Sequence, residues 1–305
     1  MVNVIKMKNP APGRMVGNLH VQIDGHGSPV VVLEAGIAAS SLSWSLVQKK
    51  IAEFTTVVSY DRAGFGWSQA ASMRCTAANA ACQLRAMLKR LEVPGPYVLV
   101  GHSFGGLIAR RFQQQYPKAV AGLVLVDPVL RSEWRQPDVN TRRKLAHGVH
   151  LSRRGAMLAR LGIVGLTLKL LVTGSQRIPK LMARATAGKG AGVTDRLVGE
   201  VRKMPQEHWP AIAAHWSRSS SFLAMAEYLE NLPLSTSHLD ERRSLDDLPT
   251  VILSAKPQPE HEHDAALSTR GQNIVVPNSG HWILLDAPAA VVEAVRRVVL
   301  QVRTQ

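Results

Sequence analysis

The segment from Val98 to Gly106 constrains the fold of this chain more than any other. An apolar run at 97–100 predicts a buried strand, the pentapeptide Gly-His-Ser-Phe-Gly follows at 101–105, and 104–116 has helical spacing. A serine at so sharp a strand-to-helix turn adopts strained backbone angles, and the residues two before and two after it must be small. The pentapeptide therefore predicts a turn that lifts the Ser103 hydroxyl clear of a sheet.

Apolar, β-branched runs alternate with helical spacings on both sides of this turn. Strands are predicted at 19–23, 29–33, 56–60, 97–100, 121–126, 248–254 and 272–276. Helices are predicted at 44–54, 76–92, 104–116 and 288–302, with a short one at 263–268. This alternation predicts an α/β fold with a mostly parallel sheet flanked by helices.

The composition of the chain changes after Leu130. Between Arg131 and Leu245 we find no convincing strand pattern, and helices are predicted at 155–172, 176–186, 194–203 and 217–232. We interpret residues 131–245 as an inserted helical cap, or lid, and residues 1–130 and 246–305 as the core domain. The cap holds 19 Lys and Arg against nine Asp and Glu, so it carries most of the net charge of +15.

This positive charge suits nucleic acid, an anionic membrane or an acidic substrate. The basic residues of the cap are not interleaved with aromatic residues and form no known nucleic-acid motif, so nucleic acid is not an expected partner. The apolar stretch 157–172 is expected to pack on the core domain. Its alternative is a peripheral contact with an anionic membrane, helped by neighbouring arginines.

The remaining composition predicts a cytoplasmic protein without a cofactor. Cys75 and Cys82 lie seven positions apart in a predicted helix, too far for a disulfide, so a reducing compartment is the default. No signal peptide and no apolar stretch of about 18 residues is found. No phosphate loop or dinucleotide motif is present either. The oligomeric state stays open.

Several segments together resemble the α/β-hydrolase fold superfamily. They run in the family's order and cover the chain apart from the cap and the first dozen residues: Gly36-Ile37, 61–68, 101–105, 125–127 and 279–281 with 286–288. The resemblance implies a serine hydrolase that cleaves an ester, thioester, lactone or amide of a small, apolar acyl substrate. The alternative is a catalytically idle member of the fold that binds a small ligand.

Ser103 is the expected nucleophile and His281 the expected base. A serine hydroxyl attacks only when a base takes its proton, and His281 lies in a Pro-Asn-Ser-Gly turn after the last predicted strand. Its place after Ser103 fits the Ser…Asp…His chain order. His102, inside the pentapeptide, is expected to point away from the nucleophile and to pack.

The acid that orients His281 is the least direct assignment. The usual family position follows the strand at 250–254, but the loop there reads Ala-Lys-Pro-Gln-Pro and holds no carboxylate. Some members carry the acid on the strand that follows the helix at 104–116, and Asp127 lies at the end of that strand here. We therefore expect Asp127 to be the acid, and Asp264 or Glu260 remains the alternative.

The backbone N–H groups of Ile37 and Phe104 are the expected oxyanion donors. Asp61-Arg62 is expected to tie the glycine-rich loop at 61–68 together and to have no catalytic part. The segment His261-Glu262-His263-Asp264 could suggest a metal site, but no further ligands accompany it at suitable spacing. A charged loop is the better interpretation, so no metal is expected.

Overall fold

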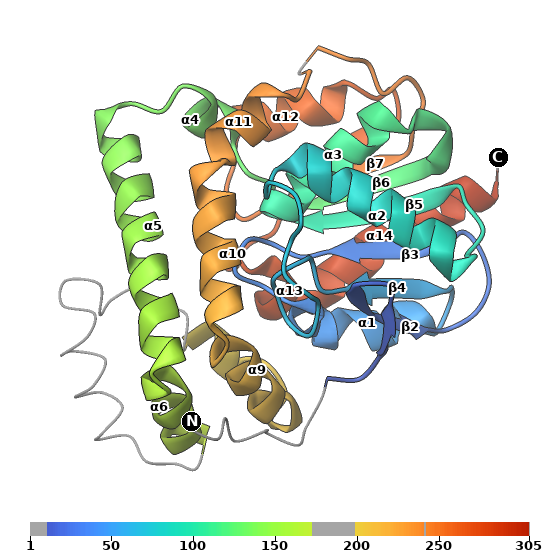
Figure 1. Ribbon diagram of the computed structural model, residues 1–305. Helices are drawn as coiled ribbons and strands as arrows, with labels where there is room; N and C mark the ends of the chain where they lie inside the picture. The colour runs from blue at the N-terminus through green and yellow to red at the C-terminus, as the bar shows by residue number, and fades with distance from the viewer. Residues whose placement is uncertain (1–10, 173–198, 241, 305) are drawn as a thin grey trace.

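An eight-stranded sheet forms the centre of the computed structural model, which describes residues 11–172, 199–240 and 242–304 (Figure 1). The strand order is β1-β2-β4-β3-β5-β6-β7-β8, and every pair from β4 to β8 is parallel. The strands are β1 (Arg14–Val16), β2 (Leu19–Asp24), β3 (Val31–Glu34), β4 (Val57–Tyr60), β5 (Tyr97–His102), β6 (Val120–Val126), β7 (Thr250–Ser254) and β8 (Gly271–Val275). The predicted α/β class is confirmed.

Helices cover both faces of the sheet, because the central strands are apolar on both sides. Val98 and Val100 of β5 pack in the cluster with α1 (Ser45–Ala52) and α14 (Pro288–Arg303). Leu99, between them, packs in the opposite cluster with α2 (Ala77–Leu91) and α3 (Phe104–Gln115). Each such fully buried side chain contributes roughly 1.5–3 kcal/mol of transfer free energy. The core is therefore two apolar layers with the sheet between them.

Two local predictions need correction. The strand β1 was not predicted; it pairs antiparallel with β2 at the edge of the sheet. Cys75 does not share a helix with Cys82, because α2 begins only after Thr76, whose side chain caps it by accepting a hydrogen bond from the Asn79 N–H at 3.2 Å. Both cysteines are free thiols.

Beyond the sheet, a group of helices faces the carboxyl ends of the parallel strands (Figure 1). They are α4 (Arg131–Arg135), α5 (Val139–Arg160), α6 (Ile163–Val172), α9 (Trp209–Trp216), α10 (Ser219–Glu230) and α11 (Leu232–Ser237). The long helices α5 and α10 lie side by side, and α6 packs on α9. In the described part of 131–245 no strand is present, whereas the boundaries of the cap stay a prediction.

The helix predicted at 155–172 is in fact the end of α5 and all of α6. Gly162 separates them with φ +76°, a left-handed conformation that glycine adopts without strain and that ends a helix. Helix α5 starts much earlier than predicted, after Asp138, whose side chain accepts the Thr141 N–H at 2.7 Å. The helix predicted at 217–232 is divided into α10 and α11. The helix predicted at 176–186 lies outside the described residues, as does the first part, 194–198, of the one predicted at 194–203; residues 199–202 are helical.

None of the helices in the described ranges is long and apolar enough to cross a membrane. The exposed apolar side chains on α5, α6 and the turn between them include Met157, Leu161 and Leu166. The stretch 157–172 was expected to pack on the core domain, and its helix α6 packs on α9 and α5. Contact with an anionic membrane stays the untested alternative.

Candidate active site

Ser103 occupies the sharp turn between β5 and α3. Its backbone has φ 54° and ψ −119°, a conformation that non-glycine residues rarely adopt. The turn is held to β6, because the Ser103 N–H donates to the Val126 carbonyl at 3.0 Å. A Cβ on Gly101 would overlap the backbone of Gly105, and one on Gly105 would overlap the Glu34 carbonyl. Glycine is therefore required at both positions, because the strand, the helix and the loop after β3 approach one another closely here.

His281 and Asp127 meet across the sheet edge beside this turn. His281 lies in the loop after β8, and its Nδ1 is 2.6 Å from Oδ2 of Asp127, the residue directly after β6. The other oxygen of Asp127 accepts the Ala255 N–H at 3.0 Å. With Nδ1 donating to the carboxylate, Nε2 of a neutral His281 is unprotonated, which is the tautomer that a general base requires.

The electrostatics of Asp127 favour its charged form. Burial alone would raise the pKa of this carboxyl, but hydrogen bonds from His281 and Ala255 outweigh it and leave the pKa below its ordinary value. The Asp127 side chain is 17% exposed, against 49% for His281. A mostly buried carboxylate thus faces a histidine that solvent and substrate can reach.

The two alternative acids contact other groups. Asp264 forms a bidentate ion pair with Arg131, at 2.5 and 2.7 Å. Glu260 accepts the N–H groups of Arg131 and Ser132, at 2.6 and 3.1 Å. Both carboxylates therefore join α12 (Pro259–Ala266) to the start of α4. Of the three candidates, Asp127 is the one that the structure brings to His281.

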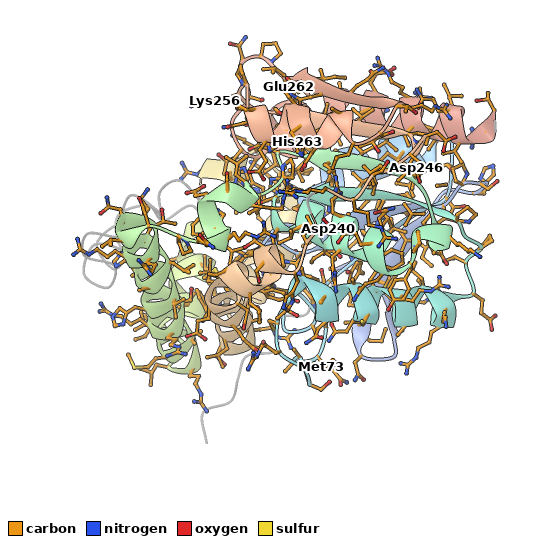
Figure 2. The ribbon with its side chains drawn as sticks, turned by 90° about the horizontal axis from the view of Figure 1, so that it is seen from above. Met73, Asp240, Asp246, Lys256, Glu262 and His263 are labelled. Atoms are coloured by element: carbon orange, nitrogen blue, oxygen red, sulfur yellow. The ribbon has the colours of Figure 1, made fainter. Side chains whose placement is uncertain are left out.

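The side chains of the possible metal segment on α12 point apart. His261 is buried, with Nδ1 2.8 Å from the Ser254 hydroxyl and Nε2 3.1 Å from the Pro128 carbonyl. Glu262 and His263 are exposed on the outer surface (Figure 2). Among the residues that the structure places, no group of three or more His, Cys, Asp or Glu could hold a metal ion.

The loop after β3 brings the second expected oxyanion donor to the nucleophile. A Cβ on Gly36 would lie 3.4 Å from the Ser103 Cβ and 3.1 Å from the His102 Nδ1, so this loop contacts the Ser103 turn directly. Ile37 follows Gly36, and Phe104 follows Ser103 as the first residue of α3. The two expected donors therefore belong to segments that flank Ser103, although their role stays a prediction.

His102 does more than pack. Its Nε2 lies 2.9 Å from the His281 carbonyl oxygen, and the two imidazole rings are 4.8 Å apart. Burial, followed by the neighbouring His281, lowers the pKa of His102 to about 3. A neutral His102 can thus donate Nε2–H to the His281 backbone and fix that loop. The pentapeptide gave the position of His102 but no signal for this bond.

Ser103 and His281 both belong to the described part of the chain, and no hydrogen bond joins the Ser103 hydroxyl to the His281 imidazole there. Such bonds are often long in free enzymes and tighten when substrate binds. The half-exposed His281 side chain has room for that adjustment, because its Nδ1 is held by a single carboxylate oxygen.

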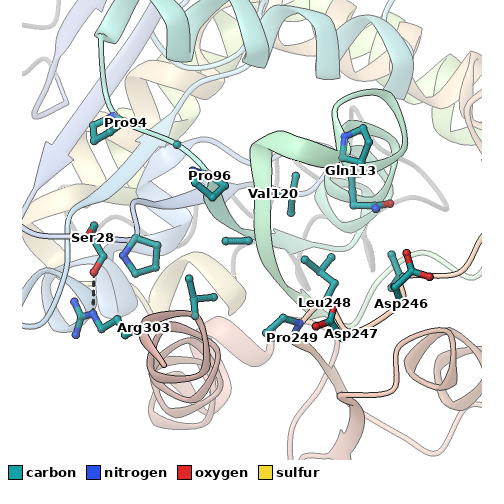
Figure 3. A pocket seen from close by; sticks show the side chains of 16 residues that line it. Ser28, Pro94, Pro96, Gln113, Val120, Asp246, Asp247, Leu248, Pro249 and Arg303 are labelled. Carbon is teal, nitrogen blue, oxygen red and sulfur yellow. Dashed lines mark hydrogen bonds between the residues drawn. The ribbon is translucent and has the colours of Figure 1, made fainter. Parts of the chain in front are cut away.

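A cavity of about 650 Å³ opens at the opposite edge of the sheet (Figure 3). Its lining includes Pro96, Val120 and Pro249, which lie at the amino ends of β5, β6 and β7, whereas Ser103 and Asp127 follow carboxyl ends. Ligands of open α/β sheets bind at the carboxyl ends of the strands. We therefore assign the candidate site from its hydrogen bonds and not from this cavity.

A family model described as the alpha/beta hydrolase family matches residues 26–294. A lipase of Mycobacterium tuberculosis, LipV, is 35% identical over 117 residues, which are 38% of this chain and 44% of the lipase. The matched segment spans less than half of the length of this lipase and of the relatives from Bacillus subtilis and Gibberella zeae.

Two solved structures illustrate the similarity of fold. A thermophilic esterase from Thermogutta terrifontis has a TM-score of 0.60 and 22% identity, with 93% of each chain covered. The epoxide hydrolase CorEH has a TM-score of 0.65 and 16% identity, with 93% of this chain and 95% of the other covered. At such identities the similarity concerns the fold alone.

Proposed function

The chain belongs to the alpha/beta hydrolase family, and we propose that within it this protein is a serine hydrolase that cleaves an ester, thioester, lactone or amide through an acyl-enzyme. The observation that carries the proposal is the 2.6 Å contact between His281 and Asp127 beside the strained Ser103 turn. A nucleophile, a base and an acid from three separate strand ends thus meet at one edge of the sheet.

In the proposed reaction, Ser103 Oγ attacks the carbonyl carbon of the substrate while His281 Nε2 takes the hydroxyl proton. Asp127 stabilises the imidazolium that forms. The carbonyl oxygen becomes an oxyanion that accepts hydrogen bonds from the Ile37 and Phe104 N–H groups. His281 then returns the proton to the leaving group, and the C–O, C–S or C–N bond breaks.

Water completes the proposed cycle. His281 takes a proton from a water molecule, whose oxygen attacks the acyl carbon, and the second oxyanion uses the same two donors. Collapse of this intermediate releases the carboxylic acid and returns the proton to Ser103. Each turnover therefore consumes one water and leaves the enzyme unchanged.

The identity of the nucleophile separates this proposal from epoxide hydrolysis. The alkyl-enzyme route to epoxide or haloalkane opening needs a carboxylate nucleophile, and this chain has Ser103 at that turn. A serine that attacks a carbonyl carbon also needs oxyanion donors, for which the Ile37 and Phe104 N–H groups are the candidates. The apolar nature of the acyl group is part of the proposal and is inferred from the apolar stretch 157–172.

The test combines covalent labelling with turnover. We expect a fluorophosphonate probe to label the wild type and Ser237→Ala, a variant of an exposed serine on α11, but not Ser103→Ala. Hydrolysis of p-nitrophenyl esters of increasing acyl length should fall by at least about 10³-fold in kcat in Ser103→Ala. Equal labelling of the two variants would refute the assignment. A folded wild type that neither reacts with the probe nor turns over would favour the idle ligand-binding alternative.

A further inference from the structure

The Arg62 side chain binds a loop that the sequence did not suggest. Asp61 does hold the glycine-rich loop, since its carboxylate accepts the Trp67 N–H at 3.0 Å and the Ser41 N–H at 2.8 Å. The Arg62 guanidinium instead donates to the carbonyl oxygens of Ala35 and Gly36, in the loop after β3. Within the glycine-rich loop Arg62 contributes its carbonyl, which accepts the Phe65 N–H at 2.9 Å, while its side chain serves the loop after β3 as well.

The two bonds set the direction of a peptide group. The Gly36 carbonyl and the Ile37 N–H belong to the same peptide, and in a trans peptide they point in opposite directions. Arg62 holds the carbonyl from the buried side, while the other side of Gly36 faces the Ser103 turn. Fixing the Gly36 carbonyl therefore also fixes the direction of the Ile37 N–H, in a loop that contacts the Ser103 turn.

Arg62 also contacts the residue that carries the other donor. Its Cζ lies 6.0 Å from the centroid of the Phe104 ring, 5.4 Å from that of Phe65 and 5.2 Å from that of Tyr228 on α10. The Phe104 and Tyr228 rings are themselves packed edge to face at 5.3 Å. One guanidinium thus lies beneath both flanks of the nucleophile and against a helix of the proposed cap.

A buried carboxylate holds the guanidinium in place. Arg62 Nη1 is 2.6 Å from Glu34 Oε1, both side chains are 2% exposed, and the Tyr60 hydroxyl donates to the other oxygen of Glu34. Burial alone would lower the pKa of Arg62, but the Glu34 charge outweighs it and leaves the pKa raised, so the guanidinium stays charged.

We propose that Arg62, held by Glu34, is a positioning residue that presets the oxyanion donors of Ile37 and Phe104; this inference rests on the proposed serine hydrolase function. A buried ion pair is weak evidence for stability, because well-packed apolar residues often serve as well. An apolar pair cannot bind two adjacent carbonyl oxygens. Lysine, a compact point charge, lacks the planar fork of donors that binds two carbonyls and a carboxylate together.

Arg62→Lys is the direct test, with Arg110→Lys as the matched control. Arg110 is likewise buried, lies in α3, and makes no hydrogen bond to the Gly36 loop among the described residues. Removing one oxyanion donor from an enzyme typically costs about 10²–10³ in kcat. We expect Arg62→Lys to lose about 10²-fold in kcat with KM within about threefold, and to lose affinity for a boronic-acid transition-state analogue by a similar factor. The control should retain both values.

Thermal unfolding of each variant separates misplacement from misfolding. If Arg62→Lys does not fold, Glu34→Gln replaces it, since the amide keeps the shape but removes the charge that fixes Arg62; the same split between kcat and KM is expected, with a smaller loss. Retained kcat and analogue affinity in a folded variant at either position would overturn the inference while leaving Ser103-dependent turnover intact. A wild type without Ser103-dependent turnover would refute the proposed function, and this inference with it.

Discussion

Asp127 uses its two carboxylate oxygens for two different tasks. One oxygen accepts a hydrogen bond from His281 Nδ1, and the other accepts one from the Ala255 N–H in the loop after β7. That loop is where the family usually places the acid, and here it contributes a backbone donor instead. The loop that carries the acid in most family members therefore helps here to hold the Asp127 carboxylate in place.

Replacing Asp127 by Asn tests whether Asp127, and not Asp264 or Glu260, is the acid of the site. The amide can keep the Ala255 bond, but it stabilises the wrong His281 tautomer and no longer compensates the imidazolium charge. We expect kcat to fall by about 10³–10⁴-fold while the protein stays folded. Asp264→Asn, which breaks the bidentate pair with Arg131, should reduce the unfolding midpoint and leave kcat of the folded protein close to the wild-type value. The reverse pattern in steady-state kinetics would move the acid to α12.

The turn between β5 and α3 depends on close contacts between three backbone segments. Gly105 lies at the start of α3 against the carbonyl of Glu34, which ends β3. Because the neighbouring atoms are backbone, they cannot move away as a flexible side chain would. This contact also places Glu34 and the loop that follows it beside Ser103.

Alanine at Gly105 should therefore displace the helix from the sheet. We expect Gly105→Ala to lose a few kcal/mol of unfolding free energy, within the usual range of about 1–3 kcal/mol for overpacking, and to lose activity. Gly148→Ala is the control, because its Cβ would meet only Leu229 Cδ1, at an ordinary 3.4 Å, within α5. That change should raise stability by up to about 1 kcal/mol through helix propensity. Equal effects in chemical denaturation would contradict the packing argument.

Two buried histidines link distant parts of the molecule. His102 joins the Ser103 turn to the His281 loop. His215, on α9, accepts the Gly66 N–H at 2.7 Å and so connects the proposed cap to the glycine-rich loop. Burial lowers the pKa of His102 to about 3 and that of His215 to about 4. Both therefore stay neutral in the folded protein at pH values where an unfolded histidine is already protonated.

The unfolding free energy should therefore decrease at acid pH, and the low pKa values of His102 and His215 account for part of that decrease. Between about pH 6.5 and pH 4 the unfolded chain binds more protons at His102 and His215, so stability falls as the pH falls, by up to about 1.4 kcal/mol per pH unit for each. His215→Gln keeps an acceptor for Gly66 but cannot titrate. We expect its unfolding free energy to depend less steeply on pH over this range than that of the wild type. Parallel curves for the two proteins in urea titrations would show that His215 is not responsible.

The charge of the molecule is not explained by the site. The net charge is +15, and the exposed apolar residues Met157, Leu161 and Leu166 lie among basic residues of α5 and α6. Nothing in the proposed reaction requires either feature. Contact with an anionic membrane, the alternative interpretation of the stretch 157–172, is thus separate from the hydrolase proposal and can fail without affecting it.

Much of the architecture was predictable because its signals are local. The runs that form β3, β5 and β6 are apolar on both faces. The Gly-His-Ser-Phe-Gly segment has, within five residues, the two glycines that a sharp turn around Ser103 requires. The class of the fold and the place of Ser103 followed from these patterns. The division of 155–172 at Gly162 did not, because both halves are compatible with a helix and the glycine alone did not indicate a break.

The contacts around the nucleophile were decided only by the folded chain. The choice of Asp127 over Asp264 and Glu260, the bond from His102 to the His281 backbone, and the attachment of Arg62 to the loop at 35–36 all join segments far apart in sequence. A carboxylate or a guanidinium can serve equally well with many partners, so its residue type does not state which one it meets. The packing of the strand ends against one another makes that choice, because it brings a particular donor within about 3 Å of a particular acceptor.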